Sequence, residues 1–298
     1  MYPRDEMGTH ARPQSKAGEK VIGLIAGAGS LPTEAARLLR ERGYSVRVIG
    51  FEGLSDSSIA AEVSEARFLR LGQLEAMAGA MTEMGVRRLL LLGKVPKSLL
   101  FDGRGIAEPD AEAIRLLSEE RERGDEPLMR AIARWLSGRG FELCDQSEIL
   151  APLLATVGPL SARAPSEVEL ADFEVGRSVV VQLGRAGVGQ CVVVNKGSVL
   201  AVEAIEGTDA TIWRAGELGG QGATVIKAAR PGQDRRFDLP AIGKTTIDAM
   251  VTSGATALAV EAHSTLIIDL EGLAKAADQA DIAVWGFAMA GSEDRRSP

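Results

Sequence analysis

Residues 21–43 read VIGLIAGAGSLPTEAARLLRERG and predict the start of an α/β fold. Residues 21–26 form a short apolar run that indicates a buried strand. A glycine-rich turn follows at residues 27–30, and residues 32–42 continue as a helix that stops at Gly43. Strands that alternate with helices in this way build parallel sheets covered on both faces.

The alternation continues through the first half of the chain. A second strand is expected at residues 46–50, and Leu74, Met77 and Met81 recur at helical spacing. Residues 88–92 read RLLLL, which is apolar on both faces and therefore predicts an interior strand of a parallel sheet. Further helices are expected at residues 109–122 and 128–137, and a last strand at 141–144. We predict a Rossmann-like N-terminal domain over residues 20–155.

A second domain of mixed α/β type is predicted over residues 156–290. Three prolines within residues 150–165 change the pattern and place the boundary there. A helix is expected at 167–183, with Leu170, Phe173 and Val179 facing inward. The other elements expected are a β-hairpin of residues 190–194 and 199–204 turning at Asn195-Lys196-Gly197, a helix from Asp209 capped by Thr208, strands at 224–228, 258–261, 266–269 and 282–287, and helices at 242–253 and 270–280. Residues 1–19 and 291–298 are expected to be loose tails.

The composition is that of an ordinary globular protein. Hydrophobic residues make up 45% and charged residues 25% of the 298 residues. The net charge of −7 argues against extensive nucleic-acid binding, because neutralising many phosphates requires a basic excess. The chain lacks a run of about 20 apolar residues and a signal-peptide pattern, so we predict a cytoplasmic protein. Cys144 and Cys191 lie in apolar contexts and are predicted to be core thiols.

The turn after the first strand is a candidate phosphate site. Gly27, Gly29 and Ser30 lie where backbone N–H groups and a helix N-terminus can face an anion. The dinucleotide fingerprint requires a third glycine where Pro32 stands, so we favour a phosphate or nucleotide contact without redox chemistry. The alternative is that these glycines serve only the geometry of a tight turn.

The carboxyl end of the strand at 88–92 is a second candidate. Gly93 and Lys94 close this strand, and open parallel sheets bind ligands in the crevice outside such ends. A surface lysine without a ligand is the alternative. Residues 95–101, VPKSLLF, are either a flap against an apolar ligand or a membrane surface, or ordinary packing.

Two groups of carboxylates are candidate metal ligands. Asp125 and Glu126 stand between two helices, where Asp125 could instead serve as a helix cap. Glu203, Glu206 and Asp209 bracket Thr208 at a strand exit and helix start. Mg²⁺ takes carboxylate oxygens and commonly shares a substrate phosphate. These five acids are therefore the predicted ligands of Mg²⁺ or Mn²⁺.

The segment GQDRRFDLP at residues 232–240 carries the sharpest candidate. Asp238 stands between Phe237 and Leu239, and a carboxylate in partly apolar surroundings is costly unless it is paired or bound to a metal. Such placement suits a catalytic or metal-bound acid, and a salt bridge to Arg235 or Arg236 is the alternative. Lys227 and Arg230, after the preceding strand, are suited to hold phosphates.

These motifs together resemble the LpxI-type UDP-2,3-diacylglucosamine pyrophosphatases. The resemblance is carried by segments spread over nearly the whole chain outside its tails: GLIAGAGSLP at 23–32, LLGKV at 91–95, GDEPLMR at 124–130, VLAVEAIEGTDA at 199–210, RPGQDRRFDLPAIGKTTI at 230–247 and GATALAVEAHSTLIID at 254–269.

The resemblance implies a substrate cleft between a Rossmann-like domain and a C-terminal α/β domain. It implies Mg²⁺-assisted hydrolysis of UDP-2,3-diacylglucosamine to UMP and 2,3-diacylglucosamine 1-phosphate, a step of lipid A synthesis. Asp238 matches the family's catalytic aspartate. The residues implied to contact the substrate are Ser30, Gly93, Lys94, Thr208 and Gln233, with Lys227 and Arg230 near its phosphates. Weak peripheral membrane association at the inner face of the cytoplasmic membrane and self-association are left open.

Two positions depart from the family pattern. Glu126 stands where the family often has aspartate, and His263 stands where it often has glycine. The sequence is also compatible with two functions other than hydrolysis. The turn at residues 27–32 leaves open a nucleotide-sugar or NAD-dependent oxidoreductase, and a non-catalytic nucleotide- or lipid-binding protein would need no metal.

Overall fold

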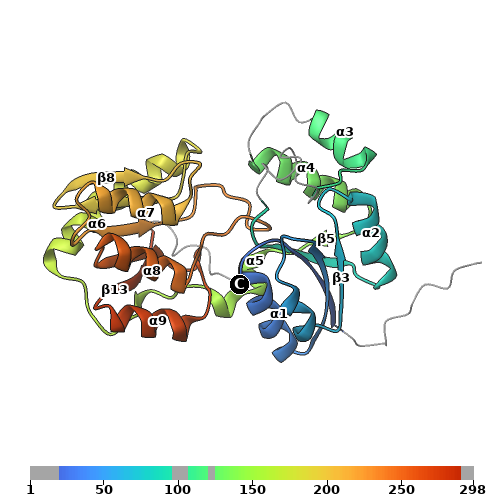
Figure 1. The fold of residues 1–298 in the computed structure, drawn as a ribbon, viewed down its shortest axis with the longest axis horizontal. Helices are drawn as coiled ribbons and strands as arrows, with labels where there is room; N and C mark the ends of the chain where they lie inside the picture. Colours follow the sequence, from blue (N-terminus) through green and yellow to red (C-terminus); the bar gives the residue numbers. More distant parts are fainter. Residues whose placement is uncertain (1–19, 96–106, 120–124, 290–298) are drawn as a thin grey trace, which may run out of the picture. The chain divides into compact units, whose positions relative to one another are not determined.

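A computed structural model describes residues 20–95, 107–119 and 125–289 and divides at Cys144/Asp145 into two compact units. The predicted tails and most of the segment 95–101 lie outside the described residues. Figure 1 shows that each unit contains its own sheet with helices packed against it. The predicted α/β class is confirmed for both parts of the chain.

The N-terminal unit is built on a parallel sheet. Its five described strands are ordered β3-β2-β1-β4-β5, the arrangement expected of a Rossmann-like fold. The strands are β1 (Lys20–Ala26), β2 (Tyr44–Phe51), β3 (Glu65–Leu69), β4 (Arg88–Leu92) and β5 (Glu142–Leu143). The helices are α1 (Leu31–Glu41), α2 (Leu74–Glu83), α3 (Ala111–Glu119) and α4 (Asp125–Gly138), with a 3₁₀ turn at Ser57–Glu62. The apolar segment RLLLL is the interior strand β4, as predicted.

The C-terminal unit has a mixed sheet between two layers of helices. In the described residues its six strands are ordered β6-β13-β11-β9-β7-β8, with β9, β11 and β13 parallel. The strands are β6 (Gly158–Pro159), β7 (Cys191–Asn195), β8 (Ser198–Val202), β9 (Thr224–Lys227), β11 (Ala257–Glu261) and β13 (Ala283–Phe287). A separate pair joins β10 (Ala241–Ile242) to β12 (Leu266–Ile267). The helices are α5 (Gln146–Ile149), α6 (Glu167–Arg185), α7 (Thr208–Glu217), α8 (Lys244–Ser253) and α9 (Leu270–Gln279), with a 3₁₀ turn at Ala151–Leu153.

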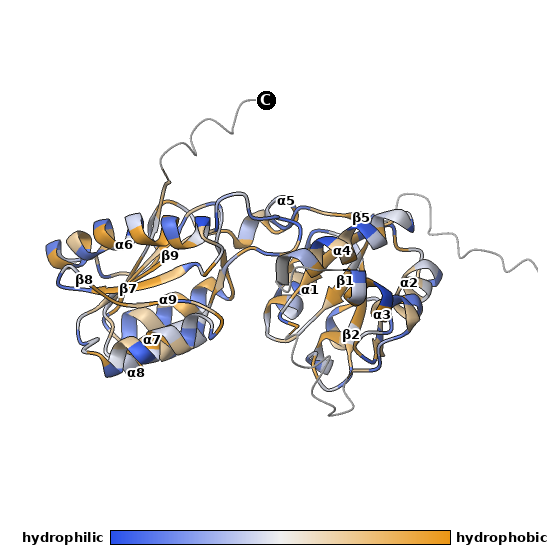
Figure 2. Cartoon of the chain, turned by 90° about the horizontal axis from the view of Figure 1, so that it is seen from above, coloured by the Kyte–Doolittle hydropathy of each residue, from blue (hydrophilic) through white to orange (hydrophobic). Residues whose placement is uncertain are grey.

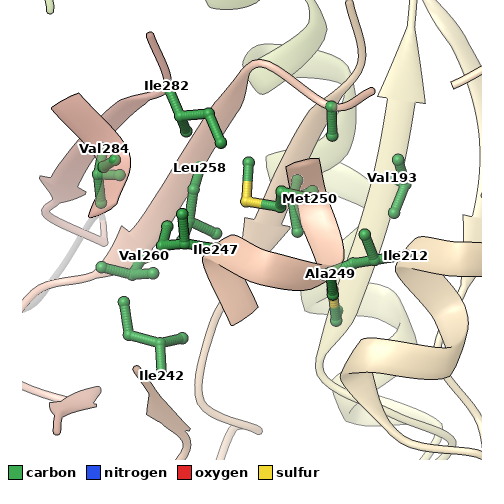
Figure 3. Packing of buried hydrophobic residues seen from close by; sticks show 14 of the residues in the cluster. Val193, Ile212, Ile242, Ile247, Ala249, Met250, Leu258, Val260, Ile282 and Val284 are labelled. Atoms are coloured by element: carbon green, nitrogen blue, oxygen red, sulfur yellow. The ribbon is translucent and has the colours of Figure 1, made fainter. Parts of the chain in front are cut away.

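Each face of this sheet has its own core. Side chains alternate along a strand, so Val225 packs toward α7, α8 and α9 whereas Ile226 packs toward α6. Figure 2 shows α6 on one side of the sheet and the other three helices on the opposite side. Figure 3 shows Ile247 of α8 close to Leu258 and Val260 of β11, and Ile212 of α7 beside Ala249 of α8. These two packed layers fix the positions of the strand ends.

Most elements fall where the sequence predicts them. The hairpin turn is confirmed: Lys196 and Gly197 have φ of 49° and 75°, as a two-residue hairpin turn requires. Both cysteines are buried and free, as predicted. Strand β3 was not predicted, and the predicted helix at 242–253 begins only at Lys244, after the short strand β10.

Two further predictions are corrected. Leu170 is 43% exposed, because α6 turns Phe173 and Val180 toward the sheet instead. Thr208 does not cap α7: Gly207 is its N-cap residue, and Thr208 is the first helical residue. Within the described ranges, none of the helices combines the length and apolar content that a membrane span requires.

Candidate functional site

The site is assembled at one edge of the C-terminal sheet. The strands β8, β9 and β11 end at this edge, because the register places Cys191, at the start of β7, opposite Lys227 and places Val260 beside Lys227. Residues 228–240, here called the 228–240 loop, leave β9 at the same edge and return at β10. Most of the predicted polar site residues of the second half lie on this loop or on the neighbouring strand ends.

Lys227, Thr208 and Glu203 form a connected group on the α7 side of the sheet. Lys227 is buried, and its Nζ donates hydrogen bonds to Thr208 Oγ1 at 3.0 Å and to the Ala241 carbonyl oxygen at 2.8 Å. Thr208 Oγ1 in turn donates to Glu203 Oε1 at 3.1 Å. Glu203 Oε2 accepts the Gln190 N–H at 3.3 Å. Glu203 is therefore held by protein donors on both of its oxygens.

Arg230 and Asp238 form an ion pair across the 228–240 loop. Their side chains are 24% and 32% exposed, so the pair is accessible to a ligand. The predicted alternative partners of Asp238 have other contacts: Arg236 pairs with Asp234 at 2.6 Å, and Arg235 donates to the His263 carbonyl oxygen at 2.9 Å. Asp238 is therefore paired with Arg230, a residue predicted to hold phosphate, rather than with Arg235 or Arg236.

The backbone of the 228–240 loop is held at several points. Gln233 Oε1 accepts the Arg230 N–H at 2.8 Å. Buried Gln146 of α5 binds both the Arg235 carbonyl oxygen, at 2.9 Å, and the Leu239 N–H, at 3.4 Å. These contacts give the Arg230–Asp238 pair a fixed support, although the residues come from distant parts of the sequence.

Two features of this edge invite an anionic or polar ligand. The N-cap residue of α7 is Gly207, which makes no side-chain cap hydrogen bond, so no capping side chain at that position competes with an anion for the first N–H groups of the helix. Gln190 Oε1 and Gln233 Nε2 are buried atoms that lack a hydrogen-bond partner in the same described ranges. Such groups in a folded protein call for an explanation, and a bound ligand supplies one.

The predicted metal ligands do not gather into one group. Glu206 pairs with Arg214 at 2.6 Å, and its own backbone N–H together with that guanidinium lowers the pKa of the Glu206 carboxyl. Asp209 lies in the first turn of α7. Asp125 and Glu126 begin α4, but their side chains lie outside the described part. In the described ranges, no cluster of three or more His, Cys, Asp or Glu side chains is arranged to hold a metal ion.

In the N-terminal unit the structure brings the two predicted glycine turns together. Ala28 and Lys94 exchange backbone hydrogen bonds of 2.8 and 3.0 Å at the carboxyl ends of β1 and β4. A Cβ atom on Gly27 would lie 2.7 Å from the Lys94 carbonyl oxygen, and one on Gly93 would lie 2.8 Å from that of Ala28. Close backbone packing thus explains why glycine is needed at both positions, and neither glycine requires a bound dinucleotide to account for it.

Other predicted residues of this turn face solvent. Gly29 has φ of 97° and open space around it, and Ser30 precedes α1 without a side-chain cap bond. Ser30 and Lys94 are exposed. They therefore lie together at the carboxyl edge of the parallel sheet, where a ligand can reach them.

Comparison with known proteins agrees with this architecture. The profile of the LpxI N-terminal domain matches residues 21–153, and that of the LpxI C-terminal domain matches residues 156–285. The chain belongs to the LpxI family. It is similar to the UDP-2,3-diacylglucosamine pyrophosphatase LpxI of Caulobacter vibrioides, with 30% identity over 89% of this chain and 96% of that protein.

Two solved structures with weak similarity to this chain have TM-scores below 0.3. The match to the crystal structure of gox2253 spans 84% of this chain and 69% of the gox2253 chain, with 14% identity and a TM-score of 0.29. The match to the biotin carboxylase domain of the Hydrogenobacter thermophilus 2-oxoglutarate carboxylase spans 69% of this chain and 37% of that domain's chain, with 14% identity and a TM-score of 0.24. Neither bears on fold or function.

The His263 departure from the family pattern has a structural reading. His263 has φ of 59°, a left-handed conformation that glycine adopts without strain. Its side chain is exposed. The position therefore favours glycine for backbone reasons, and histidine is tolerated there.

Proposed function

We propose that this chain hydrolyses UDP-2,3-diacylglucosamine to UMP and 2,3-diacylglucosamine 1-phosphate in lipid A synthesis. The observation that carries the proposal is the accessible Arg230–Asp238 pair on the supported 228–240 loop, in a chain of the LpxI family. The name of the Caulobacter relative supports the substrate. Lys227 and the uncapped α7 N-terminus, among the described residues, support recognition of phosphate.

The proposed reaction is attack of water on the α-phosphorus. A bond forms between the water oxygen and this phosphorus, and its bond to the bridging oxygen breaks. The bridging oxygen leaves on 2,3-diacylglucosamine 1-phosphate, and the water proton passes to Asp238. Phosphoryl chemistry depends mainly on orientation and charge stabilisation, which Arg230 and Lys227 can supply to the phosphate oxygens.

Dependence on Mg²⁺ or Mn²⁺ remains part of the proposal. The described carboxylates do not fit a protein-only metal cage, since Glu203 and Glu206 are bound by protein donors. Mg²⁺ needs only one or two carboxylates when substrate phosphates complete its shell. Asp209, Asp125 and Glu126 are the candidates for that smaller set, and no catalytic step is assigned to the metal.

The test is release of UMP from UDP-2,3-diacylglucosamine, measured with and without EDTA. We expect turnover by the unchanged chain and its loss on chelation. Asp238→Asn keeps the size of the side chain but removes its charge, and we expect kcat to fall by about 100-fold or more. Glu174→Gln alters an exposed carboxylate on α6 and is the control.

Three results would contradict the proposal. Full turnover by a folded Asp238→Asn variant would remove Asp238 from the chemistry. Equal turnover with and without EDTA would contradict the proposed dependence on Mg²⁺ or Mn²⁺. Release of UMP from UDP-N-acetylglucosamine, but not from the diacylated substrate, would change the substrate class.

The acylated substrate also suggests where the protein acts. We propose a cytoplasmic protein that associates weakly with the inner face of the cytoplasmic membrane. With a net charge of −7, such association should be local rather than driven by the overall charge.

A further inference from the structure

Glu261 is a partly buried carboxylate at the site edge, and the proposed chemistry gives it no role. It is the last residue of β11, which lies between β9 and β13 in the sheet. Its Oε2 accepts the backbone N–H of Ala229 at 2.9 Å. Ala229 immediately precedes Arg230, so this contact fixes the backbone that carries the guanidinium paired with Asp238.

Glu261 acts from the face of the sheet opposite Lys227. Leu258 and Val260 pack on the side of α7, α8 and α9, whereas Ala257 and Ala259 pack on the α6 side. Because side chains alternate along a strand, Glu261 lies on the α6 side. Lys227 contacts Thr208 of α7 on the other side. The start of the 228–240 loop is thus held from both faces of the sheet.

Helix α6 packs against the turn at Arg230 and Pro231. A Cβ atom added at Gly184 would lie 2.9 Å from Pro231 Cδ and 3.2 Å from Arg230 Cα. The turn therefore has little room to move toward α6 while the Glu261 carboxylate holds its N–H. Burial raises the pKa of the Glu261 carboxyl, although the Ala229 N–H, Ser264 and Arg235 oppose this shift. A hydrogen bond in partly buried surroundings is stronger than one in water.

We propose that Glu261 is a positioning residue that holds residues 229–230 and thereby sets the placement of Arg230 against Asp238 and the substrate phosphates. This inference rests on the proposed function for its kinetic consequence. The required property of Glu261 is an acceptor oxygen at this point, rather than a proton or a charge.

The first test compares Glu261→Ala with Glu261→Gln. Glutamine keeps an acceptor for the Ala229 N–H, whereas alanine removes it. We expect Glu261→Ala to lower kcat for UMP release by roughly 10- to 100-fold with KM changed by less than about threefold, because displaced catalytic groups slow the chemical step. Glu261→Gln should remain within about threefold of the unchanged chain.

The second test does not depend on activity. Hydrogen–deuterium exchange resolved at the Ala229 amide, by NMR or with peptides that begin at least two residues before it, reports this contact directly. Exchange should be roughly fivefold faster or more in Glu261→Ala and unchanged in Glu261→Gln. If the unchanged chain releases no UMP, the proposed function fails while this measurement still decides the structural inference.

Two further variants complete the design. Asp278→Ala removes a carboxylate that accepts one backbone N–H, that of Ala162 at 2.7 Å, near the opposite edge of the sheet. It should leave kcat unchanged. Gly184→Ala pushes on Arg230 and Pro231 from α6 and should lower kcat with Glu261 intact. It also keeps the inference testable if Glu261→Ala does not fold.

Particular outcomes overturn the inference. An unchanged kcat and unchanged exchange in Glu261→Ala would show that the contact positions nothing. A Glu261→Gln variant as impaired as Glu261→Ala would show that the carboxyl acts through its proton or charge.

Discussion

At the scale of single residues, the Thr208 hydroxyl is the link on which two buried charged groups depend. It accepts from Lys227 Nζ and donates to Glu203 Oε1. Thr208→Val removes both bonds without changing the shape of the side chain. Because unsatisfied buried polar groups are costly, we expect the free energy of unfolding to fall by about 1–3 kcal/mol. Denaturant unfolding measures the change.

Two matched variants separate this effect from a general loss of a threonine hydroxyl. Thr208→Ser keeps the hydroxyl and should stay within about 1 kcal/mol of the unchanged chain. Thr252→Val removes an exposed hydroxyl of α8 that donates to the Asp248 carbonyl oxygen at 2.9 Å, and should cost less than about 0.5 kcal/mol. An equal loss in all three variants would contradict the assignment.

At the scale of elements, the turn after β1 packs against the turn after β4, and this contact predicts that alanine destabilises the fold to different extents at two glycines. Gly29 and Gly93 both have positive φ, at 97° and 87°. Only Gly93 is also crowded, since a Cβ atom there would lie 2.8 Å from the Ala28 carbonyl oxygen. We expect Gly29→Ala to cost about 1–2 kcal/mol from backbone strain alone, and Gly93→Ala to cost more. Unfolding curves of the two variants give the comparison, and equal costs would show that this contact relaxes freely.

The elements also show what sequence patterns miss. The hairpin and the interior strand β4 were predictable, because turn residues and apolar runs act over a few neighbouring positions. Strand β3, EARFL, was missed because its apolar residues do not form a continuous run. The exposure of Leu170 was missed because its orientation depends on how α6 packs against the sheet.

At the scale of the whole molecule, stability should depend on pH through a carboxylate that ties distant segments together. Glu169 accepts two hydrogen bonds from Arg163, at 2.7 and 3.0 Å, and one from Thr256 at 2.6 Å. Burial opposes ionisation of Glu169, but these donors and Ser166 outweigh it and lower the pKa of its carboxyl to about 2. The stabilisation is therefore complete above the ordinary pKa of 4.5 and is lost as pH falls toward 2.

Glu169→Gln tests this dependence. The unchanged chain should exceed the variant in free energy of unfolding by on the order of 3 kcal/mol at pH 7, and by less at pH 3. Urea unfolding at the two pH values provides the measurement. A difference that does not narrow at pH 3 would exclude Glu169 as the cause.

Much of the candidate site was predictable as a set of residues, but its pairings were not. Asp238, Lys227, Arg230 and Gln233 were identified because charged side chains in glycine-punctuated turns after apolar strands are typical of binding sites. Glu261 gave only a weak signal, as a single acid at the end of an apolar strand. Nothing local distinguished it from a solvated residue.

The sequence by itself determined the alternation of strands and helices, the hairpin, the core thiols and the segments that carry charge. Each depends on the spacing of residues within about one or two turns of chain. Only the tertiary structure decided that Asp238 pairs with Arg230 instead of its neighbours, that Glu203 binds Thr208, and that Glu261 holds Ala229. These contacts join strand ends and loops that are distant in sequence, and their geometry exists only once the sheet has fixed the order and register of its strands.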